Sequence, residues 1–221
     1  MMKIYPSLIS CDVLNLASTL AALDSHVDGY HIDIMDDHFV PNLTWGPTLV
    51  NALAGATTKP LQMHLMVENP ASWVTRLNLQ KKDSFVFHRE VVRYVQDGVK
   101  LIEELKKRDI KAGLALNPKT GVEQLEPFVS LLDEILIMSV NPGFSGQKFI
   151  ESACDKVPAL VAMRQQKNLK FNICMDGGIG ASNICSLQQA GVQIVSVASA
   201  IFSSSNYCQA LMNLYALLGK S

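Results

Sequence analysis

Four polar side chains interrupt apolar runs in three separate parts of the sequence. His31 and Asp33 lie in Gly-Tyr-His-Ile-Asp-Ile-Met-Asp, His64 in Leu-Gln-Met-His-Leu-Met-Val, and Asp176 in Phe-Asn-Ile-Cys-Met-Asp-Gly-Gly. Two imidazoles and two carboxylates form a donor set that suits a divalent cation. Taken alone, a histidine in an apolar strand is more often a hydrogen-bonded core residue, and Asp176 could cap a helix. The joint pattern, with a carboxylate that is costly to bury unpaired, favours a metal-centred enzyme site.

The elements that must position these residues follow a regular order along the chain. Strands are expected over residues 3–6, 30–35, 61–67, 84–87, 111–116, 134–138, 171–175 and 194–197. Helical patterns lie between them at 13–23, with Asp12 as its N-cap, and at 95–107, 154–166, 184–190 and 206–218. Eight β-then-α units predict an α/β fold, a single (β/α)8 TIM barrel that spans residues 1–221 as one domain. A doubly wound open sheet is the alternative architecture.

A barrel would bring the four polar side chains together. Side chains alternate along a strand, so His31, Asp33 and Met35 share one face, and His64 shares a face with Met66. One face of each strand fills the barrel interior, and functional groups gather at the carboxyl ends of the strands. The sequence therefore predicts that these residues meet at that end.

Small residues follow the last three expected strands. They form the loops 141–147 (Asn-Pro-Gly-Phe-Ser-Gly-Gln), 176–180 (Asp-Gly-Gly-Ile-Gly) and 198–200 (Ala-Ser-Ala). Glycine lets backbone N–H groups approach an anion, and barrels often bind phosphate near the loops after strands seven and eight. Ordinary turn chemistry explains any one of these loops, whereas three together favour phosphate. No Walker-type loop or Gly-x-Gly-x-x-Gly motif follows the first strand, so a nucleotide cofactor is not indicated.

Composition narrows the function classes. The chain has 221 residues, 48% apolar and 18% charged, with a net charge of −1, so a large core is expected and no basic field favours nucleic acid. No apolar run is long enough to span a membrane, and the N-terminus carries no secretory pattern. Five cysteines without a Cys-x-x-Cys motif indicate reduced thiols and a cytoplasmic protein.

Several longer segments carry a resemblance to one family. They are Tyr-Pro-Ser-Leu from Tyr5, His-Ile-Asp-Ile-Met-Asp from His31, His-Phe-Val-Pro-Asn from His38, His-Leu-Met from His64, Leu-Asn-Pro from Leu116, Met-Ser-Val-Asn-Pro-Gly-Phe-Ser-Gly-Gln from Met138 and Asp-Gly-Gly-Ile from Asp176. In these segments, over nearly its whole length, the chain resembles the ribulose-phosphate 3-epimerase family.

The resemblance implies a (β/α)8 fold and interconversion of D-ribulose 5-phosphate with D-xylulose 5-phosphate through an ene-diolate. It implies one divalent ion (Zn, Fe(II), Mn or Co) held by His31, Asp33, His64 and Asp176, the two aspartates also serving as acid and base. Ser7 and His64 would contact the sugar, and Met35, Met66 and Met138 would line the reacting centre. The phosphate would be bound by Gly143, Phe144, Ser145, Gly146, Gly177, Gly178, Ala198 and Ser199. A homo-oligomer is expected on the same basis.

The residues are consistent with this chemistry in their own right. Inversion at C3 requires removal of a proton from one face and delivery of a proton to the other, and hence two acid/base groups on opposite sides of the substrate. We expect Asp33 to take the proton in one direction and Asp176 to return one, with the roles exchanged in reverse.

Three positions depart from the family pattern. Asp37 and Ala198 stand where the family usually has glycine, and Cys174 stands where it often has glutamate. Asp tolerates positive φ, so Asp37 is compatible with a left-handed turn, and its charge would lie near the metal. The Cβ of Ala198 is expected to weaken the phosphate contact, and nothing in the sequence explains Cys174.

Three rival functions remain. An epimerase of a hexulose 6-phosphate such as D-allulose 6-phosphate would use the same catalytic set, although Asp-Gly-Gly favours the pentulose. A sugar-phosphate decarboxylase would need an Asp-x-Lys-x-x-Asp array, which does not occur. A sugar-phosphate sensor without activity is disfavoured because all four candidate ligands are present.

Overall fold

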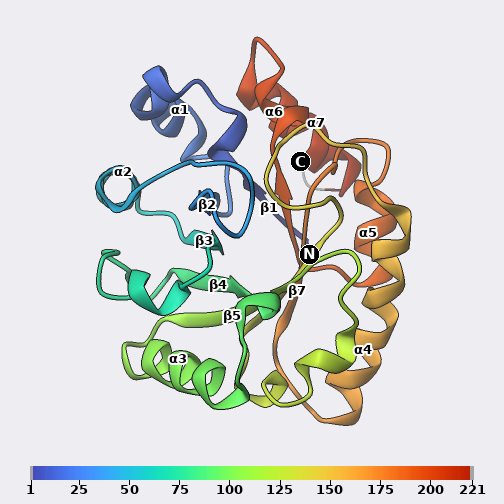
Figure 1. Cartoon of the computed structure of the whole chain (residues 1–221). Helices are drawn as coiled ribbons and strands as arrows, with labels where there is room; N and C mark the ends of the chain where they lie inside the picture. The colour runs from blue at the N-terminus through green and yellow to red at the C-terminus, as the bar shows by residue number, and fades with distance from the viewer. Residues whose placement is uncertain (1, 220–221) are drawn as a thin grey trace.

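Eight parallel strands form the centre of the molecule. The computed structural model describes residues 2–219. The strands are β1 (Lys3–Pro6), β2 (Tyr30–Met35), β3 (Leu61–Met66), β4 (Ser84–His88), β5 (Lys111–Leu116), β6 (Glu134–Met138), β7 (Asn172–Asp176) and β8 (Ile194–Val197). All eight expected strands are confirmed, with differences of one residue at the ends of β3, β4 and β7. Figure 1 shows them surrounded by helices.

The strand order makes the sheet a barrel. Neighbours follow the order β1-β8-β7-β6-β5-β4-β3-β2, and every pair is parallel. β1 and β2, at the two ends of this order, approach each other through a parallel bridge between Ser7 and His31. The open doubly wound sheet is therefore wrong, and the (β/α)8 barrel is confirmed.

Helices cover the outside of the strands. They are α1 (Leu16–Leu23), α2 (Pro47–Ala56), α3 (Val95–Lys107), α4 (Lys156–Gln166), α5 (Ile184–Ala190), α6 (Ser199–Phe202) and α7 (Tyr207–Leu217). The expected helix at 13–23 divides into a 3-10 turn, Val13–Asn15, followed by α1, and Asp12 caps the turn by accepting from the N–H of Leu14. The expected helix at 154–166 begins later, because residues Glu151–Asp155 form a 3-10 turn before α4.

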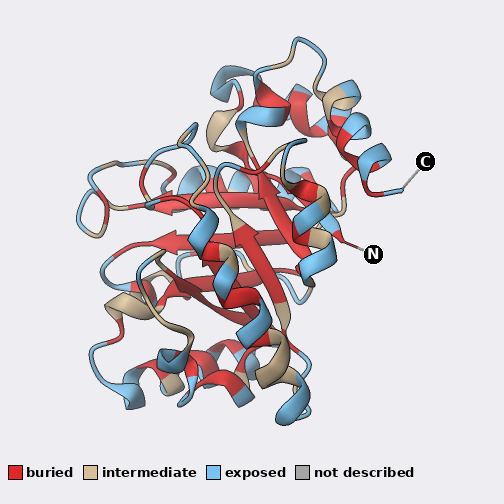
Figure 2. Cartoon of the chain, turned by 90° about the vertical axis from the view of Figure 1, so that its right-hand side faces the viewer, coloured by how far each residue is buried: buried red, intermediate tan, exposed pale blue. Residues whose placement is uncertain are grey.

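The barrel has two cores. Figure 2 shows strands that are almost entirely buried and helices that are buried only on their inner side. The larger apolar core lies between strands and helices. A smaller cluster inside the ring consists of Tyr5, Val86, Ala115, Leu136, Met138, Val140, Cys174 and Ile194. The interior also holds fully buried polar side chains, among them Gln62, His64 and His88. The interior is thus apolar in part and polar where the candidate ligands lie.

Among the described residues, no helix is long and apolar enough to cross a membrane.

Candidate metal centre and substrate cavity

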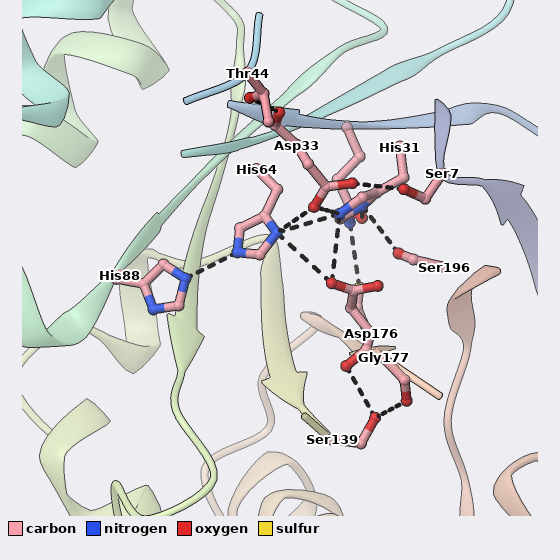
Figure 3. A network of polar contacts seen from close by, with 12 residues as sticks. Ser7, His31, Asp33, Thr44, His64, His88, Ser139, Asp176, Gly177 and Ser196 are labelled. Atoms are coloured by element: carbon pink, nitrogen blue, oxygen red, sulfur yellow. Dashed lines mark hydrogen bonds and ion pairs between the residues drawn. The ribbon is translucent and has the colours of Figure 1, made fainter. Parts of the chain in front are cut away.

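The four predicted ligands meet inside the barrel. Figure 3 shows the imidazoles of His31 and His64 between the carboxyl groups of Asp33 and Asp176. One ligand atom from each residue lies within 4.8 Å of all the others. His31 Nε2 is 3.2 Å from both Asp33 Oδ1 and His64 Nδ1, and 3.7 Å from Asp176 Oδ2. His64 Nδ1 is 3.3 Å from Asp33 Oδ1 and 3.8 Å from Asp176 Oδ2.

These distances fit a small divalent ion. Tetrahedral ligands at about 2.0–2.1 Å from an ion are about 3.3–3.4 Å apart from each other. The five separations, from 3.2 to 3.8 Å, bracket that value. The facing imidazole nitrogens of His31 and His64 also need a proton or a cation between them. The donor set can therefore hold a divalent metal ion, and its identity is not determined by the ligands alone.

A chain of hydrogen bonds orients His31 from the side of its ring that faces away from the other ligands. Its Nδ1 lies 2.7 Å from Gln62 Oε1 and 2.9 Å from Ser196 Oγ. The amide of Gln62 is fixed in turn, because its Nε2 donates to Glu134 Oε2 at 2.7 Å. Gln62 therefore presents its oxygen to His31, so Nδ1 carries a proton, and Nε2 is the nitrogen that can bind a metal once it gives up its own proton.

Hydroxyl groups hold the carboxylate of Asp33 and the backbone around both aspartates. The hydroxyl of Ser7 donates to Asp33 Oδ2 at 2.5 Å, and Thr44 Oγ1 donates to the carbonyl oxygen of Asp33 at 2.6 Å. Ser139 Oγ contacts the carbonyl oxygens of Asp176 at 2.9 Å and Gly177 at 2.6 Å. These bonds fix the ends of β2 and β7, from which the two carboxylates reach the same space.

The surroundings shift the pKa values of the two carboxyl groups in opposite directions. Burial raises the pKa of each, but the imidazoles of His31 and His64 outweigh this effect at Asp33 and lower its pKa well below the usual range. At Asp176 burial prevails and the pKa is raised. Burial lowers the pKa of His64 to about 4, whereas the carboxylates raise the pKa of His31 to about 9 against the effect of burial. The two aspartates thus differ in proton affinity.

One cavity joins the carboxylates to the glycine loops. It is lined by most of the predicted site residues, namely Ser7, Asp33, Met35, Met66, Met138, Gly143, Phe144, Ser145, Gly146, Asp176, Gly177, Gly178, Ala198 and Ser199. His31 and His64 do not line it, because they are fully buried behind the carboxylates. Of the other lining residues, Pro142, Gln147 and Ile179 belong to the predicted small-residue loops, whereas Ile9, Val140 and Ser196 were not predicted to line the site.

Glycine is required at the turn after β7. Gly177 and Gly178 have φ of 110° and 64°, in the left-handed region. A Cβ on Gly178 would lie 2.7 Å from the backbone nitrogen of Phe149. The Gly-Gly pair therefore lets this turn pack closely against the loop after β6, which brings both loops to the cavity.

Comparison with known proteins identifies the family. The profile of the Ribulose-phosphate 3 epimerase family matches residues 3–202. The chain belongs to the ribulose-phosphate 3-epimerase family. It is 35% identical to the ribulose-phosphate 3-epimerase of Bacillus subtilis, with 97% of this chain and 98% of that protein covered. It is 37% identical to the enzyme of Treponema pallidum, with 90% of each chain covered. It is 39% identical to the cytoplasmic isoform of Oryza sativa, with 91% of this chain and 88% of that one covered. The expectation of an enzyme of the epimerase type is confirmed.

Solved structures agree with the fold. The KGPDC of Streptococcus mutans matches with a TM-score of 0.73 at 13% identity, with coverage of 99% of this chain and 97% of that one. The orotidine 5'-monophosphate decarboxylase of Sulfolobus solfataricus matches with a TM-score of 0.70 at 13% identity, with coverage of 99% and 98%. At this identity the similarity shows the barrel fold alone.

The structure accounts for two of the three departures from the family pattern. Asp37 has φ of 58°, so the left-handed conformation anticipated for it is confirmed. Asp37 is exposed and does not line the cavity. Cys174 lies inside the barrel with its Sγ 3.7 Å from Gln62 Nε2, the same nitrogen that donates to Glu134. Glu134 on β6 therefore supplies a carboxyl group beside the position where a glutamate on β7 would place one. Ala198 lines the cavity as expected.

Sequence reasoning missed three polar residues that support the ligands. Gln62 and Glu134 interrupt apolar runs in the same way as His64 does, and that signal was available. His88 ends β4, one residue beyond the expected strand. Its Nε2 lies 2.9 Å from His64 Nε2, so it contacts a predicted ligand directly.

Proposed function

We propose that this chain interconverts D-ribulose 5-phosphate and D-xylulose 5-phosphate by moving a proton at C3. The observation that carries the proposal is the placement of Asp33 and Asp176, whose carboxyl groups approach one cavity from β2 and β7. The names of the relatives and the family support this substrate pair.

We propose that His31, Asp33, His64 and Asp176 together hold one divalent ion, which is Zn, Fe(II), Mn or Co. The four ligand atoms are close enough to share a single ion. When bound, the ion supplies positive charge that stabilises the negative charge developing beside the substrate carbonyl during proton removal.

In the proposed mechanism Asp33 and Asp176 are the catalytic acid and base. Asp33 takes the C3 proton on one face and Asp176 delivers a proton on the other, and the roles are exchanged in the reverse reaction. The placement of the two carboxyl groups supports this division, because both line the cavity and they come from different strands, β2 and β7. The hydrogen bond from Ser7 keeps Asp33 aimed into the cavity, and Ser7 also reaches the sugar.

Apolar and small residues complete the proposed site. Met35, Met66 and Met138 line the cavity and would exclude water from C3. The phosphate would lie against the loops of Gly143, Phe144, Ser145, Gly146, Gly177, Gly178, Ala198 and Ser199. Among the described residues no lysine or arginine lines this cavity, so N–H and hydroxyl groups would bind the phosphate.

Substitution of each aspartate tests the mechanism. Asp33→Asn and Asp176→Asn are expected to abolish turnover and the incorporation of solvent deuterium at C3. Asp37→Asn is the matched control, because this exposed residue adopts a left-handed conformation that asparagine tolerates, and it should keep full activity. Metal content is measured for every variant, so that loss of the ion is separated from loss of proton transfer. Substantial deuterium incorporation by both variants would refute the assignment.

A substrate comparison tests the specificity. The purified protein is incubated with ribulose 5-phosphate and with allulose 6-phosphate, before and after chelation. Faster turnover of the pentulose that is lost on chelation and restored by metal supports the proposal. Preference for the hexulose would show that the hexulose phosphate is the substrate. Binding of either sugar phosphate without turnover would identify a sugar-phosphate sensor.

We also propose that residues 1–221 form one domain, that the protein is cytoplasmic and that it forms a homo-oligomer. All five cysteines are free, which agrees with a reducing compartment. Sedimentation of the purified chain and fractionation of cells test the last two properties.

A further inference from the structure

A second hydrogen-bonded chain leads from the candidate ligand His64 toward the rim of the barrel. The ligand nitrogen of His64 is Nδ1, and its other nitrogen, Nε2, lies 2.9 Å from His88 Nε2 (Figure 3). His88 Nδ1 lies 3.2 Å from Glu90 Oε2. The rings of His64 and His88 stack with centroids 5.0 Å apart. His88 therefore connects the ligand cluster to the carboxyl group of Glu90.

Glu90 determines the direction of these hydrogen bonds. Its Oε1 accepts from the N–H of Asn117 at 2.8 Å and from the hydroxyl of Thr120. Burial raises the pKa of Glu90, but hydrogen bonds from His88 and Thr120 outweigh burial and lower it to about 2. The carboxylate is thus ionised at neutral pH and can only accept, so His88 Nδ1 must donate.

The proton positions then follow along the chain. A proton on His88 Nδ1 leaves Nε2 as the nitrogen that can accept, and it accepts from the N–H of His64. A proton of His64 on Nε2 leaves the lone pair on Nδ1, as metal binding requires. That nitrogen is the one that faces His31, Asp33 and Asp176.

Glu90 is itself held by a rigid support. The loop that contains Asn117 and Thr120 follows β5, and Lys156 at the start of α4 donates to the carbonyl oxygens of Asn117 at 3.1 Å and Pro118 at 2.6 Å. Lys156 is buried, so its ammonium group anchors this loop. The position of Glu90 therefore depends on packed elements and not on a free side chain.

We propose that Glu90 is a positioning residue that fixes the tautomer of His64 through His88 and thereby strengthens the binding of the metal ion. The inference rests on the metal site of the proposed function. Neither Glu90 nor His88 lines the cavity, so their effect on the site passes through His64.

Glu90→Gln is the most direct test. Three donors converge on the two oxygens of Glu90, so an amide at this position must turn its NH2 toward at least one of them. With two donors at Oε1, the NH2 is expected at Oε2, facing His88 Nδ1. This reverses the chain and places the proton of His64 on Nδ1. We expect zinc to bind 10- to 100-fold more weakly, the size typical of changes behind metal-ligating histidines.

The readout is the dissociation constant for zinc alone, measured by competition with a chelator at constant pH. The matched control is Glu134→Gln, because the chain behind His31 needs only an acceptor for Gln62, and we expect less than a threefold change there. Nitrogen-15 spectra of the metal-free protein report which nitrogen of His64 carries the proton, which a purely structural role for Glu90 would not alter.

His88 supplies an independent pair of variants if Glu90→Gln fails to fold. In His88→Gln the amide oxygen can accept from His64 and the NH2 can donate to Glu90, so we expect zinc affinity within about threefold of the original. His88→Leu removes the acceptor and should lose 10- to 100-fold. Equal zinc affinity for the original protein and both Glu90→Gln and His88→Leu overturns the inference. An original protein that binds no zinc, Fe(II), Mn or Co overturns the proposed metal site instead.

Discussion

Each of the two imidazoles of the candidate metal centre is supported by a chain of hydrogen bonds that ends at a glutamate, and the two glutamates differ in burial. His31 leads through Gln62 to Glu134, and His64 leads through His88 to Glu90. Glu134 is fully buried within the barrel, and burial raises its pKa although hydrogen bonds from Gln62 and Ser84 oppose the effect. The side chain of Glu90 is 22% exposed and its pKa is lowered.

Both chains end at a carboxyl oxygen that accepts a hydrogen bond, but the surroundings favour the ionised form only at Glu90. Glu90 accepts three donors near the rim, and these stabilise an ionised carboxylate. Glu134 lies where ionisation is costly, and a neutral carboxyl oxygen is sufficient to orient an amide. We expect substitutions in the two chains to have different consequences for stability and for metal binding.

The largest expected effect is that of Gln62→Leu on stability. This change removes one hydrogen bond from Glu134 and one from the Nδ1–H of His31 deep in the barrel, at about 0.5–1.5 kcal/mol for each, although Ser84 and Ser196 remain as partners. His88→Leu should cost less, because Glu90 retains two donors and is partly exposed to water. Denaturant unfolding in the presence of chelator measures both free energies. An equal or larger loss for His88→Leu would contradict the contrast between the two chains.

The pH dependence of stability should have opposite signs in the two chains. The pKa of Glu90 is lowered from 4.5 to about 2, so its stabilisation is complete above pH 4.5 and is lost as the pH falls toward 2. At about 1.4 kcal/mol per pH unit, this difference corresponds to at most about 3.5 kcal/mol. The raised pKa of Glu134 has the reverse effect, since stability is lost as the pH rises through its folded-state value.

Unfolding of the original protein, Glu90→Gln and Glu134→Gln across acid and neutral pH measures these contributions. Glu90→Gln should remove part of the acid sensitivity, and Glu134→Gln should increase stability at neutral pH relative to acid. Parallel pH profiles for all three proteins would show that neither carboxyl group behaves as its surroundings predict.

A smaller effect is expected when the buried carboxyl group is moved to the neighbouring strand. Glu134→Leu should destabilise the protein by about 1–3 kcal/mol, because Gln62 Nε2 loses its acceptor. Adding Cys174→Glu should restore much of the loss, because this position also approaches Gln62 Nε2. Cys174→Glu alone should be destabilising, since it places two carboxyl groups around one amide. If the double variant recovers no stability, a carboxyl group on β7 cannot replace the one on β6 as the acceptor for Gln62.

The smallest expected effect lies outside both chains, at the phosphate end of the cavity. Ala198→Gly removes a Cβ from the cavity lining and should lower KM a fewfold, with little change in zinc affinity. Steady-state kinetics with ribulose 5-phosphate measure this change. A KM that is unchanged or raised would show that the methyl group does not hinder the phosphate.

Much of the fold could be predicted from the sequence because each strand is a short and mainly apolar run. Helix α3 was also predicted with its observed bounds, since its charged and apolar residues alternate with helical spacing. Helix α2 was not anticipated. Its sequence, Pro-Thr-Leu-Val-Asn-Ala-Leu-Ala-Gly-Ala, has little polar patterning, and packing of Val50, Leu53 and Ala54 selects the helix.

The sequence by itself determined the donor set, because two histidines and two aspartates within apolar strands are costly unless they are used together. It also determined the glycine turns, since Gly177 and Gly178 adopt conformations that other residues avoid. Only the tertiary structure decided which nitrogen of each imidazole faces the ligand cluster. That choice depends on Gln62, Glu134, His88 and Glu90, which come from different strands and loops. Hydrogen-bond direction is a property of atoms in contact, and no spacing along the chain records which of them will meet.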